Sequence, residues 1–175
     1  TAYRRQRQMC IRDRFDSYLM TLGLETLSLR VRHEVESARR LAEYCRNHPK
    51  VERVSFVGFE SHPSYANAKK YFRFGSSAVF TIELKGTLDS TVRFVESLNL
   101  AAHMVMIGDS VTVVTHPAST THKQLSDADL AAAGVTPTML RISVGLENTD
   151  DLIDDFEQAF AHIGYCLLYT SPSPR

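Results

Sequence analysis

The predicted fold is decided by one short stretch, Leu140-Arg141-Ile142-Ser143-Val144-Gly145-Leu146-Glu147. Leu140, Ile142 and Val144 alternate with Arg141 and Ser143, and this two-residue period is typical of a strand with one buried face. Successive strand side chains point to opposite faces, so we expect Arg141 and Ser143 on the face away from the core. The stretch therefore predicts a strand that carries one arginine toward a surface.

Other strands are expected on either side of this stretch. Residues 80–85 alternate in the same way, with Phe80, Ile82 and Leu84 apolar, and residues 51–57 form a shorter candidate. Two further apolar runs, 104–107 and 111–114, flank a Gly-Asp-Ser turn signal.

Helices are expected between these strands. A long one begins at Phe15 and ends at His48-Pro49, and Gly23 indicates a kink or a separate short helix before it. Its apolar residues recur at steps of three and four: Leu24, Leu27, Val31, Val35, Ala38, Ala42 and Cys45.

Shorter helices are predicted at 64–72, at 88–98, after the capping residue Ser126 with Asp129 at the reciprocal position, and at 149–163. Leu152, Phe156, Phe160 and Ile163 form the buried stripe of the last helix. Strands and helices thus alternate, which predicts one α/β or α+β domain with helices packed on one face of a sheet of about three to five strands.

The composition excludes several classes of function. The 175 residues carry 20 basic and 20 acidic side chains, so no nucleic-acid footprint is expected. No apolar run approaches the roughly 18 residues that span a bilayer, so no membrane association is expected. Cys10, Cys45 and Cys166 form no spaced pair, which disfavours a disulfide framework and a zinc site. A reducing cytoplasm is the expected location.

The two ends differ from the middle. Residues 1–14 hold a dense basic run, for which the simple interpretation is a solvated arm and the functional one an RNA-binding or membrane-surface tail. The segment Gln-Met-Cys-Ile-Arg-Asp-Arg within it resembles translated sequencing-adapter read-through, and residues 166–175 resemble the matching artefact. We therefore expect 1–14 and 164–175 to be non-native, which leaves Cys45 as the one native cysteine.

Arg141 is the strongest single candidate for binding. Its planar guanidinium binds a carboxylate through two parallel hydrogen bonds, which a lysine ammonium cannot reproduce. Periodicity alone favours a simpler alternative, an exposed strand arginine paired with a neighbouring acid.

Other polar clusters carry weaker signals. A metal site at His116 and His122 requires a third ligand such as Asp109 or Cys45, so two hydrogen-bonded structural histidines are the better interpretation. The hydroxyls of residues 119–121 lack the Gly-x-Ser-x-Gly context of a hydrolase nucleophile. The Gly-Ser-Ser at 75–77 fits a phosphate nest, and equally a plain loop before a strand.

The middle of the chain resembles the pyridoxal-phosphate (PLP) enzymes of cysteine and methionine metabolism. The resemblance spans roughly residues 15–163 and rests on segments that follow the family's order: 23–30, 51–54, 61–63, 108–109, His116-Pro117-Ala118-Ser119-Thr120-Thr121-His122, 130–135 and 141–147. Within the family, the Ser-Thr-Thr-His form and the Ala-Ala-Gly-Val-Thr-Pro run are most similar to O-acetylhomoserine sulfhydrylases, which convert O-acetylhomoserine and sulfide to homocysteine and acetate.

This resemblance implies a fold and a site. Residues 15–47 would be the helix that links the two domains, and 48–163 the small C-terminal domain of a fold-type I transferase, with a mostly antiparallel sheet. Arg141 would bind the α-carboxylate of the amino-acid substrate, with Thr121 supporting it. Met106 stands where the family commonly has a serine or asparagine near the substrate, and methionine donates no hydrogen bond.

The resemblance also implies what this chain lacks. The family's Schiff-base lysine, phosphate-binding residues and pyridine-nitrogen partner precede residue 15, so no catalytic or cofactor-binding residue is expected here. The chain is thus interpreted as a fragment, inactive alone, of an enzyme that forms homotetramers. Two alternatives remain: a fragment of a cystathionine γ-synthase or methionine γ-lyase, and a stand-alone carboxylate-binding α/β module.

Overall fold

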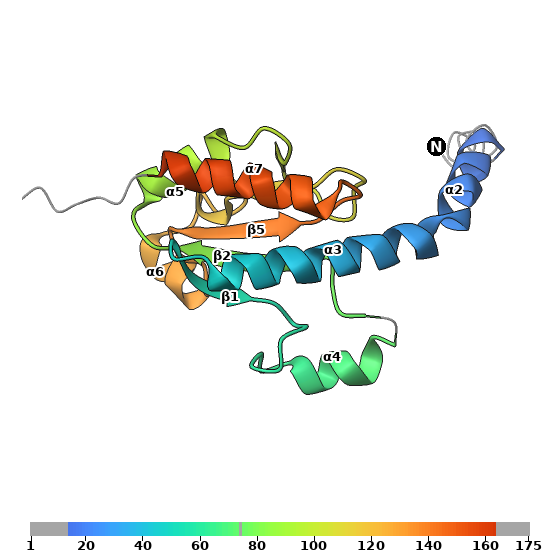
Figure 1. The fold of residues 1–175 in the computed structure, drawn as a ribbon, viewed down its shortest axis with the longest axis horizontal. Helices are drawn as coiled ribbons and strands as arrows, with labels where there is room; N and C mark the ends of the chain where they lie inside the picture. The colour runs from blue at the N-terminus through green and yellow to red at the C-terminus, as the bar shows by residue number, and fades with distance from the viewer. Residues whose placement is uncertain (1–13, 74, 164–175) are drawn as a thin grey trace, which may run out of the picture.

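The computed structural model describes residues 14–73 and 75–163, so the expected non-native tails, apart from Arg14, lie outside the described residues. Figure 1 shows a sheet with helices packed beside it, while the first described helix extends away from it at the N-terminal end. The elements are, in chain order, α2 (Phe15–Glu25), α3 (Leu27–Asn47), β1 (Val51–Ser55), α4 (Tyr65–Tyr71), β2 (Val79–Leu84), α5 (Leu88–Glu96), β3 (Ala102–His103), β4 (Val113–Thr115), the 3₁₀ turn η1 (Pro117–Ser119), α6 (Asp127–Ala132), β5 (Met139–Ser143) and α7 (Thr149–His162).

The sheet has the strand order β1-β2-β5-β4-β3. All neighbouring strands are antiparallel except β3 and β4, which pair in parallel. The expected mixed α/β fold with a mostly antiparallel sheet is therefore confirmed. The stretch around Arg141 forms the central strand β5, because it pairs on both sides and most of its length is buried.

One face of the sheet carries the hydrophobic core. Ile82, Leu140 and Ile142 are fully buried in one cluster with side chains of α3, α5 and α7. Helix α3 packs on β1 and β2, and α7 packs against both α3 and α5. The stripe predicted for the last helix is buried as expected: Leu152, Phe156, Phe160 and Ile163. Burial of each such side chain contributes roughly 1.5–3 kcal/mol.

The long N-terminal element consists of two helices, because the structure divides it at Thr26 into α2 and α3. The separate short helix that Gly23 indicated is therefore present as α2. In a continuous helix the carbonyl of Gly23 would accept the backbone N–H of Leu27. Instead the Arg30 guanidinium donates to that carbonyl at 2.6 Å, and Arg30 Nε also donates to the Thr26 hydroxyl at 3.3 Å. The break therefore lies three residues after the glycine at which a kink was expected.

Only the C-terminal half of the apolar stripe in this region is buried. Ala38, Ala42 and Cys45 are fully buried on α3, whereas Leu24 and Leu27 near the break are exposed. None of the α2 residues is buried, and α2 bends away from the rest of the molecule (Figure 1). The packing of α3 on the sheet thus begins well inside the helix.

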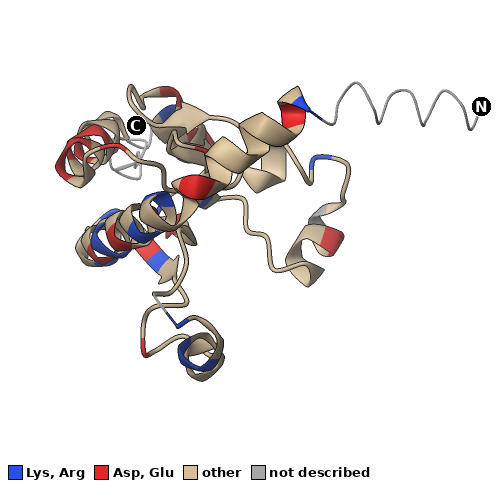
Figure 2. Ribbon diagram, turned by 90° about the vertical axis from the view of Figure 1, so that its right-hand side faces the viewer, with Lys and Arg blue, Asp and Glu red and all other residues tan. Residues whose placement is uncertain are grey.

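The surface shows both signs of charge. Basic and acidic residues are spread over several elements in Figure 2 rather than joined in one stripe. No helix in the described ranges is both long and apolar enough to cross a membrane.

Candidate functional site

Arg141 lies on the central strand of the sheet, on the face opposite the core formed with α3, α5 and α7. In the strand register it is directly opposite Thr81 of β2 on one side and Thr115 of β4 on the other. Its neighbours along the strand, Leu140 and Ile142, point into the core and are fully buried. The alternation read from the sequence therefore places the arginine where it was expected, and its side chain is half-buried.

The Arg141 guanidinium has an unusual environment. Its Nη2 donates a hydrogen bond to Thr115 Oγ1 at 3.3 Å, while its Nε is buried and meets no acceptor among the described residues. None of the ion pairs formed within residues 14–73 and 75–163 includes this arginine. The alternative of an exposed strand arginine paired with an acid is therefore wrong. A half-buried guanidinium without a carboxylate partner is suited to an anion from outside the chain.

The segment from Met104 to Gly108 crosses this face beside Arg141 and is tied at both ends. Thr115 Oγ1 donates to the carbonyl oxygen of Met104 at 2.6 Å. The backbone N–H of Gly108 donates to Ser143 Oγ at 3.2 Å. Because Ser143 follows Arg141 by two residues on the same face, the two ties hold the segment close to the guanidinium.

The side chains of this segment face solvent. Met106, the residue expected near the substrate, is 46% exposed, and Met104, Val105 and Ile107 are exposed as well. The apolar run at 104–107 therefore does not continue β3 into the core, whereas Val113 and Val114 of the following run are buried in β4. The structure thus brings Arg141 and the segment of Met106 to the same face of the sheet.

Thr121 was expected to support Arg141. It lies in the turn after η1, where it is exposed and its hydroxyl shares a hydrogen bond with His122 Nδ1 at 2.8 Å. The hydroxyl that contacts Arg141 is that of Thr115. A supporting role for Thr121 stays a prediction.

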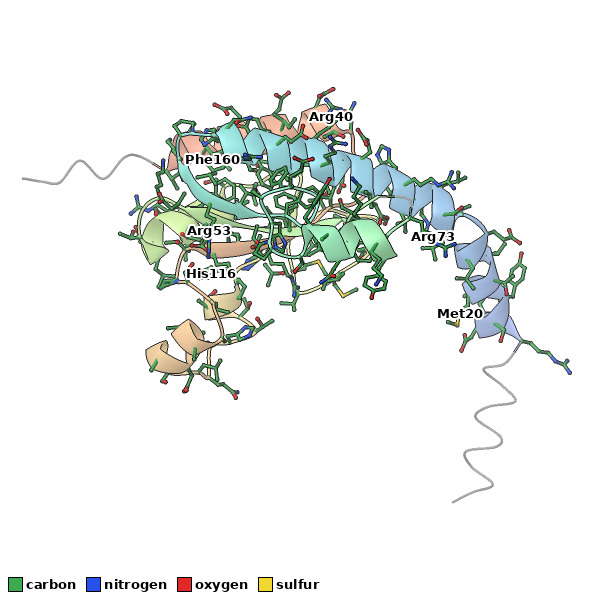
Figure 3. All side chains as sticks on the ribbon, turned by 90° about the horizontal axis from the view of Figure 1, so that it is seen from below. Met20, Arg40, Arg53, Arg73, His116 and Phe160 are labelled. Atoms are coloured by element: carbon green, nitrogen blue, oxygen red, sulfur yellow. The ribbon has the colours of Figure 1, made fainter. Side chains whose placement is uncertain are left out.

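His116 is a structural residue. It is buried (labelled in Figure 3), with Nδ1 2.7 Å from Ser119 Oγ and Nε2 2.9 Å from the carbonyl oxygen of Pro137. The hydroxyl of Thr120 donates to the His116 carbonyl at 2.7 Å. Both ring nitrogens are thus engaged, as the structural interpretation predicted, and no metal-binding cluster occurs among the residues that the structure describes.

The Gly-Ser-Ser segment before β2 serves the local backbone. Ser77 Oγ accepts the backbone N–H of Val79 at 3.0 Å, as in a loop that leads into a strand. Gly75 and Ser76 line a cavity of about 700 Å³ between α3 and the loop that carries α4. None of Arg141, Thr121 and Met106 lines this cavity.

Sequence reasoning missed two polar residues near the site. Thr115 ends a run of apolar residues and gave no signal, because its role depends on pairing between β4 and β5. Glu147 stands inside the recognised motif, and its carboxylate accepts hydrogen bonds from the Thr112 backbone and hydroxyl at 2.6 and 2.7 Å.

Comparison with known proteins decides the family. The model of the Cys/Met metabolism PLP-dependent enzymes matches residues 5–161. The chain belongs to this family. A solved structure of a putative O-acetylhomoserine (thiol)-lyase from Campylobacter jejuni, which contains N'-pyridoxyl-lysine-5'-monophosphate, is 35% identical with a TM-score of 0.77, over 82% of this chain and 34% of that one.

Three curated relatives support the same family assignment. Homocysteine synthase of Schizosaccharomyces pombe is 46% identical over 83% of this chain and 34% of its own length. O-acetyl-L-homoserine sulfhydrylase 1 of Thermus thermophilus is 43% identical over 84% and 35%. An L-methionine gamma-lyase of Fusobacterium nucleatum is 38% identical over 85% and 37%. The chain therefore spans about a third of the length of the relatives it matches.

Enzymes of this family use PLP, and a lysine side chain is the group that binds this cofactor covalently. Lys50 and Lys85 donate to backbone carbonyls, of Phe160 at 2.5 Å and of Pro49 at 3.0 Å. Lys69 and Lys70 lie over tyrosine rings of their own helix, and Lys123 is exposed. Lys69 lines the cavity between α3 and the loop that carries α4, but its ammonium lies over the Tyr65 ring. The carboxylates of Glu36, Glu43 and Glu60 line the same cavity and would repel a phosphate. The described residues thus do not fit the cofactor.

Proposed function

We propose that this chain is the substrate-carboxylate-binding part of a PLP-dependent transferase that converts O-acetylhomoserine and sulfide to homocysteine and acetate. The sulfide sulfur forms a bond to the γ-carbon of the amino acid, and the acetate oxygen leaves from that carbon. The lysine and the cofactor-binding groups would belong to another part of the enzyme, as would most of the homotetramer interface.

One observation carries the proposal: Arg141 presents a half-buried guanidinium without an acidic partner, on the face of the sheet opposite the core formed with α3, α5 and α7. A carboxylate bound there forms charge-assisted hydrogen bonds, each worth roughly 1.5–3 kcal/mol. The identity of 43–46% to a homocysteine synthase and an O-acetyl-L-homoserine sulfhydrylase supports this choice of reaction.

A chimera tests the proposal. Residues 15–163 replace the corresponding third of the Thermus thermophilus sulfhydrylase, and homocysteine is measured with O-acetylhomoserine and sulfide. We expect activity, and we expect Arg141→Lys to raise the KM for O-acetylhomoserine by about 10- to 100-fold.

Arg53→Lys is the matched control. Arg53 is an exposed strand arginine on β1 (Figure 3), and it pairs with Glu83. Lysine keeps the positive charge beside Glu83, whose side chain is 15% exposed, so this change should leave the KM within about twofold. An unchanged KM in Arg141→Lys would overturn the role of Arg141.

The same chimera separates the alternatives. Faster use of cysteine than sulfide would make the chain a cystathionine γ-synthase fragment, and release of methanethiol from methionine would make it a methionine γ-lyase fragment, for which the 38% identical relative is a precedent. An inactive chimera, together with carboxylate binding by the 175-residue chain alone, would favour the stand-alone module. An absorbance band of a PLP–lysine adduct in the chain alone would contradict the prediction that this chain lacks the lysine that binds PLP.

A further inference from the structure

We infer that Thr115 is a positioning residue for the substrate carboxylate, because its single hydroxyl fixes both Arg141 and the Met104–Gly108 segment. This inference rests on the proposed function, in which Arg141 binds the carboxylate. Thr115 would touch no substrate and would act through the guanidinium.

The geometry assigns each hydrogen bond a direction. A threonine hydroxyl has one proton to donate and two lone pairs that accept. The proton goes to the carbonyl oxygen of Met104 at 2.6 Å, so a lone pair is left for Arg141 Nη2 at 3.3 Å. Since the carbonyl fixes the rotation of the hydroxyl, it also fixes where the lone pair points. The guanidinium is thus held by an acceptor whose own orientation is set.

Burial strengthens the hydrogen bond between Thr115 and Arg141. Thr115 is 1% exposed, and hydrogen bonds are stronger where water is excluded. Among the described residues, no other side chain accepts a hydrogen bond from Arg141. Without the Thr115 hydroxyl the guanidinium would keep its charge and lose its orientation, and a bidentate bond to a carboxylate requires that orientation.

The Thr115 hydroxyl also connects Arg141 to the exposed Met104–Gly108 segment. Met104 is the first residue of that segment, and Met106 lies two residues later. Loss of the Thr115 tie would therefore free one end of the segment and turn the guanidinium in the same step. Thr81, the neighbour of Arg141 on the other side in the register, accepts no hydrogen bond from it within the described part of the chain.

The test compares substitutions of Thr115 in the chimera and in the whole 175-residue chain. Thr115→Val keeps the shape and removes the hydroxyl, whereas Thr115→Ser keeps the hydroxyl. We expect Thr115→Val to raise the KM for O-acetylhomoserine about tenfold while kcat and the KM for sulfide stay within about twofold. Thr115→Ser should restore the KM, and Thr81→Val, the control, should leave it unchanged.

The second readout requires no catalysis. The side-chain Nε–H signal of Arg141, followed by NMR during titration of the whole chain with O-acetylhomoserine, should show about tenfold weaker binding in Thr115→Val. If the valine variant fails to fold by circular dichroism, Thr115→Ser and Thr115→Ala form the replacement pair, because they differ only in the hydroxyl.

The outcomes separate the two proposals. If Arg141→Lys leaves the KM for O-acetylhomoserine unchanged, the proposed carboxylate site fails. If Arg141→Lys weakens binding but Thr115→Val does not, or if serine is as damaging as valine, only the positioning role of Thr115 is overturned. Equal effects of Thr115→Val on the KM values for both substrates would also overturn it, since a general loss of structure has that signature.

Discussion

Glu147 accepts two hydrogen bonds from one residue, Thr112: its carboxylate lies 2.6 Å from the backbone nitrogen and 2.7 Å from the hydroxyl. The Thr112 hydroxyl in turn accepts the backbone N–H of Gly145 at 2.9 Å. These bonds connect the chain after β5 to the chain before β4. The bonds thus hold together the ends of β4 and β5, the two strands in which Thr115 and Arg141 are paired.

Removal of this carboxylate should destabilise the domain. Glu147→Ala leaves the Thr112 donors unsatisfied, and we expect the free energy of unfolding to fall by about 2–3 kcal/mol. Urea denaturation measures the change, with Glu52→Ala on the exposed side of β1 as the control. Equal stability of the two variants would show that the bonds contribute nothing net.

Gly145 permits a close crossing of two backbones. A Cβ atom at this position would lie 2.4 Å from the carbonyl oxygen of Ser110 and 2.6 Å from the nitrogen of Thr112. Gly145→Ala should therefore lower the free energy of unfolding by roughly 1–3 kcal/mol, as overpacking does.

Gly23, unlike Gly145, has room for a Cβ atom. A Cβ there would meet nothing within 4 Å, and the residue lies within helix α2. Gly23→Ala should raise the helix content seen by circular dichroism, because alanine is favoured over glycine in a helix by about 0.8–1 kcal/mol. Destabilisation by both glycine substitutions would contradict the steric explanation.

Asp155 organises the turn between α5 and β3. Its carboxylate accepts three backbone N–H groups, of Asn99 at 2.8 Å, Leu100 at 3.1 Å and Ala101 at 3.0 Å. Asp155→Asn turns one acceptor into a donor, so we expect a loss of about 2–4 kcal/mol in the free energy of unfolding. Asp151→Asn on the exposed face of α7 is the control, and hydrogen exchange at the three amides locates the effect.

The stability of the domain should depend on the protonation of His48. Burial lowers the pKa of this imidazole from its ordinary value of 6.5, and Lys50 lowers it further, although Glu157 raises it. His48 Nδ1 accepts the backbone N–H of Lys50 at 3.3 Å, and the ring stacks on Phe160 at 3.9 Å. Protonation of Nδ1 would break that hydrogen bond.

The sign of the pH effect follows from these pKa values. Because the folded pKa lies below the unfolded one, the unfolded state binds more protons between them. The His48 contribution is therefore complete above pH 6.5 and is lost as the pH falls from there toward the folded pKa. Denaturation curves between about pH 5 and 8 should show this slope, and His48→Gln should reduce it; an unchanged slope would count against His48.

Much of the fold was predictable because its signals are local. The alternation at 80–84 and 140–144 placed β2 and β5, and the stripe of Leu152 and Phe156 placed α7. The helix break at Thr26 was displaced from Gly23 because the side chain of Arg30 competes for a backbone carbonyl. No propensity scale contains that contact.

The sequence by itself determined which face of its strand Arg141 occupies, since a period of two residues is a property of the strand alone. Only the tertiary structure decided that Thr115 lies opposite this arginine and that the Met104–Gly108 segment is tied beside it. Strand pairing brings together residues 26 positions apart. Which strands pair depends on the packing of the whole sheet, so no local pattern in the sequence records it.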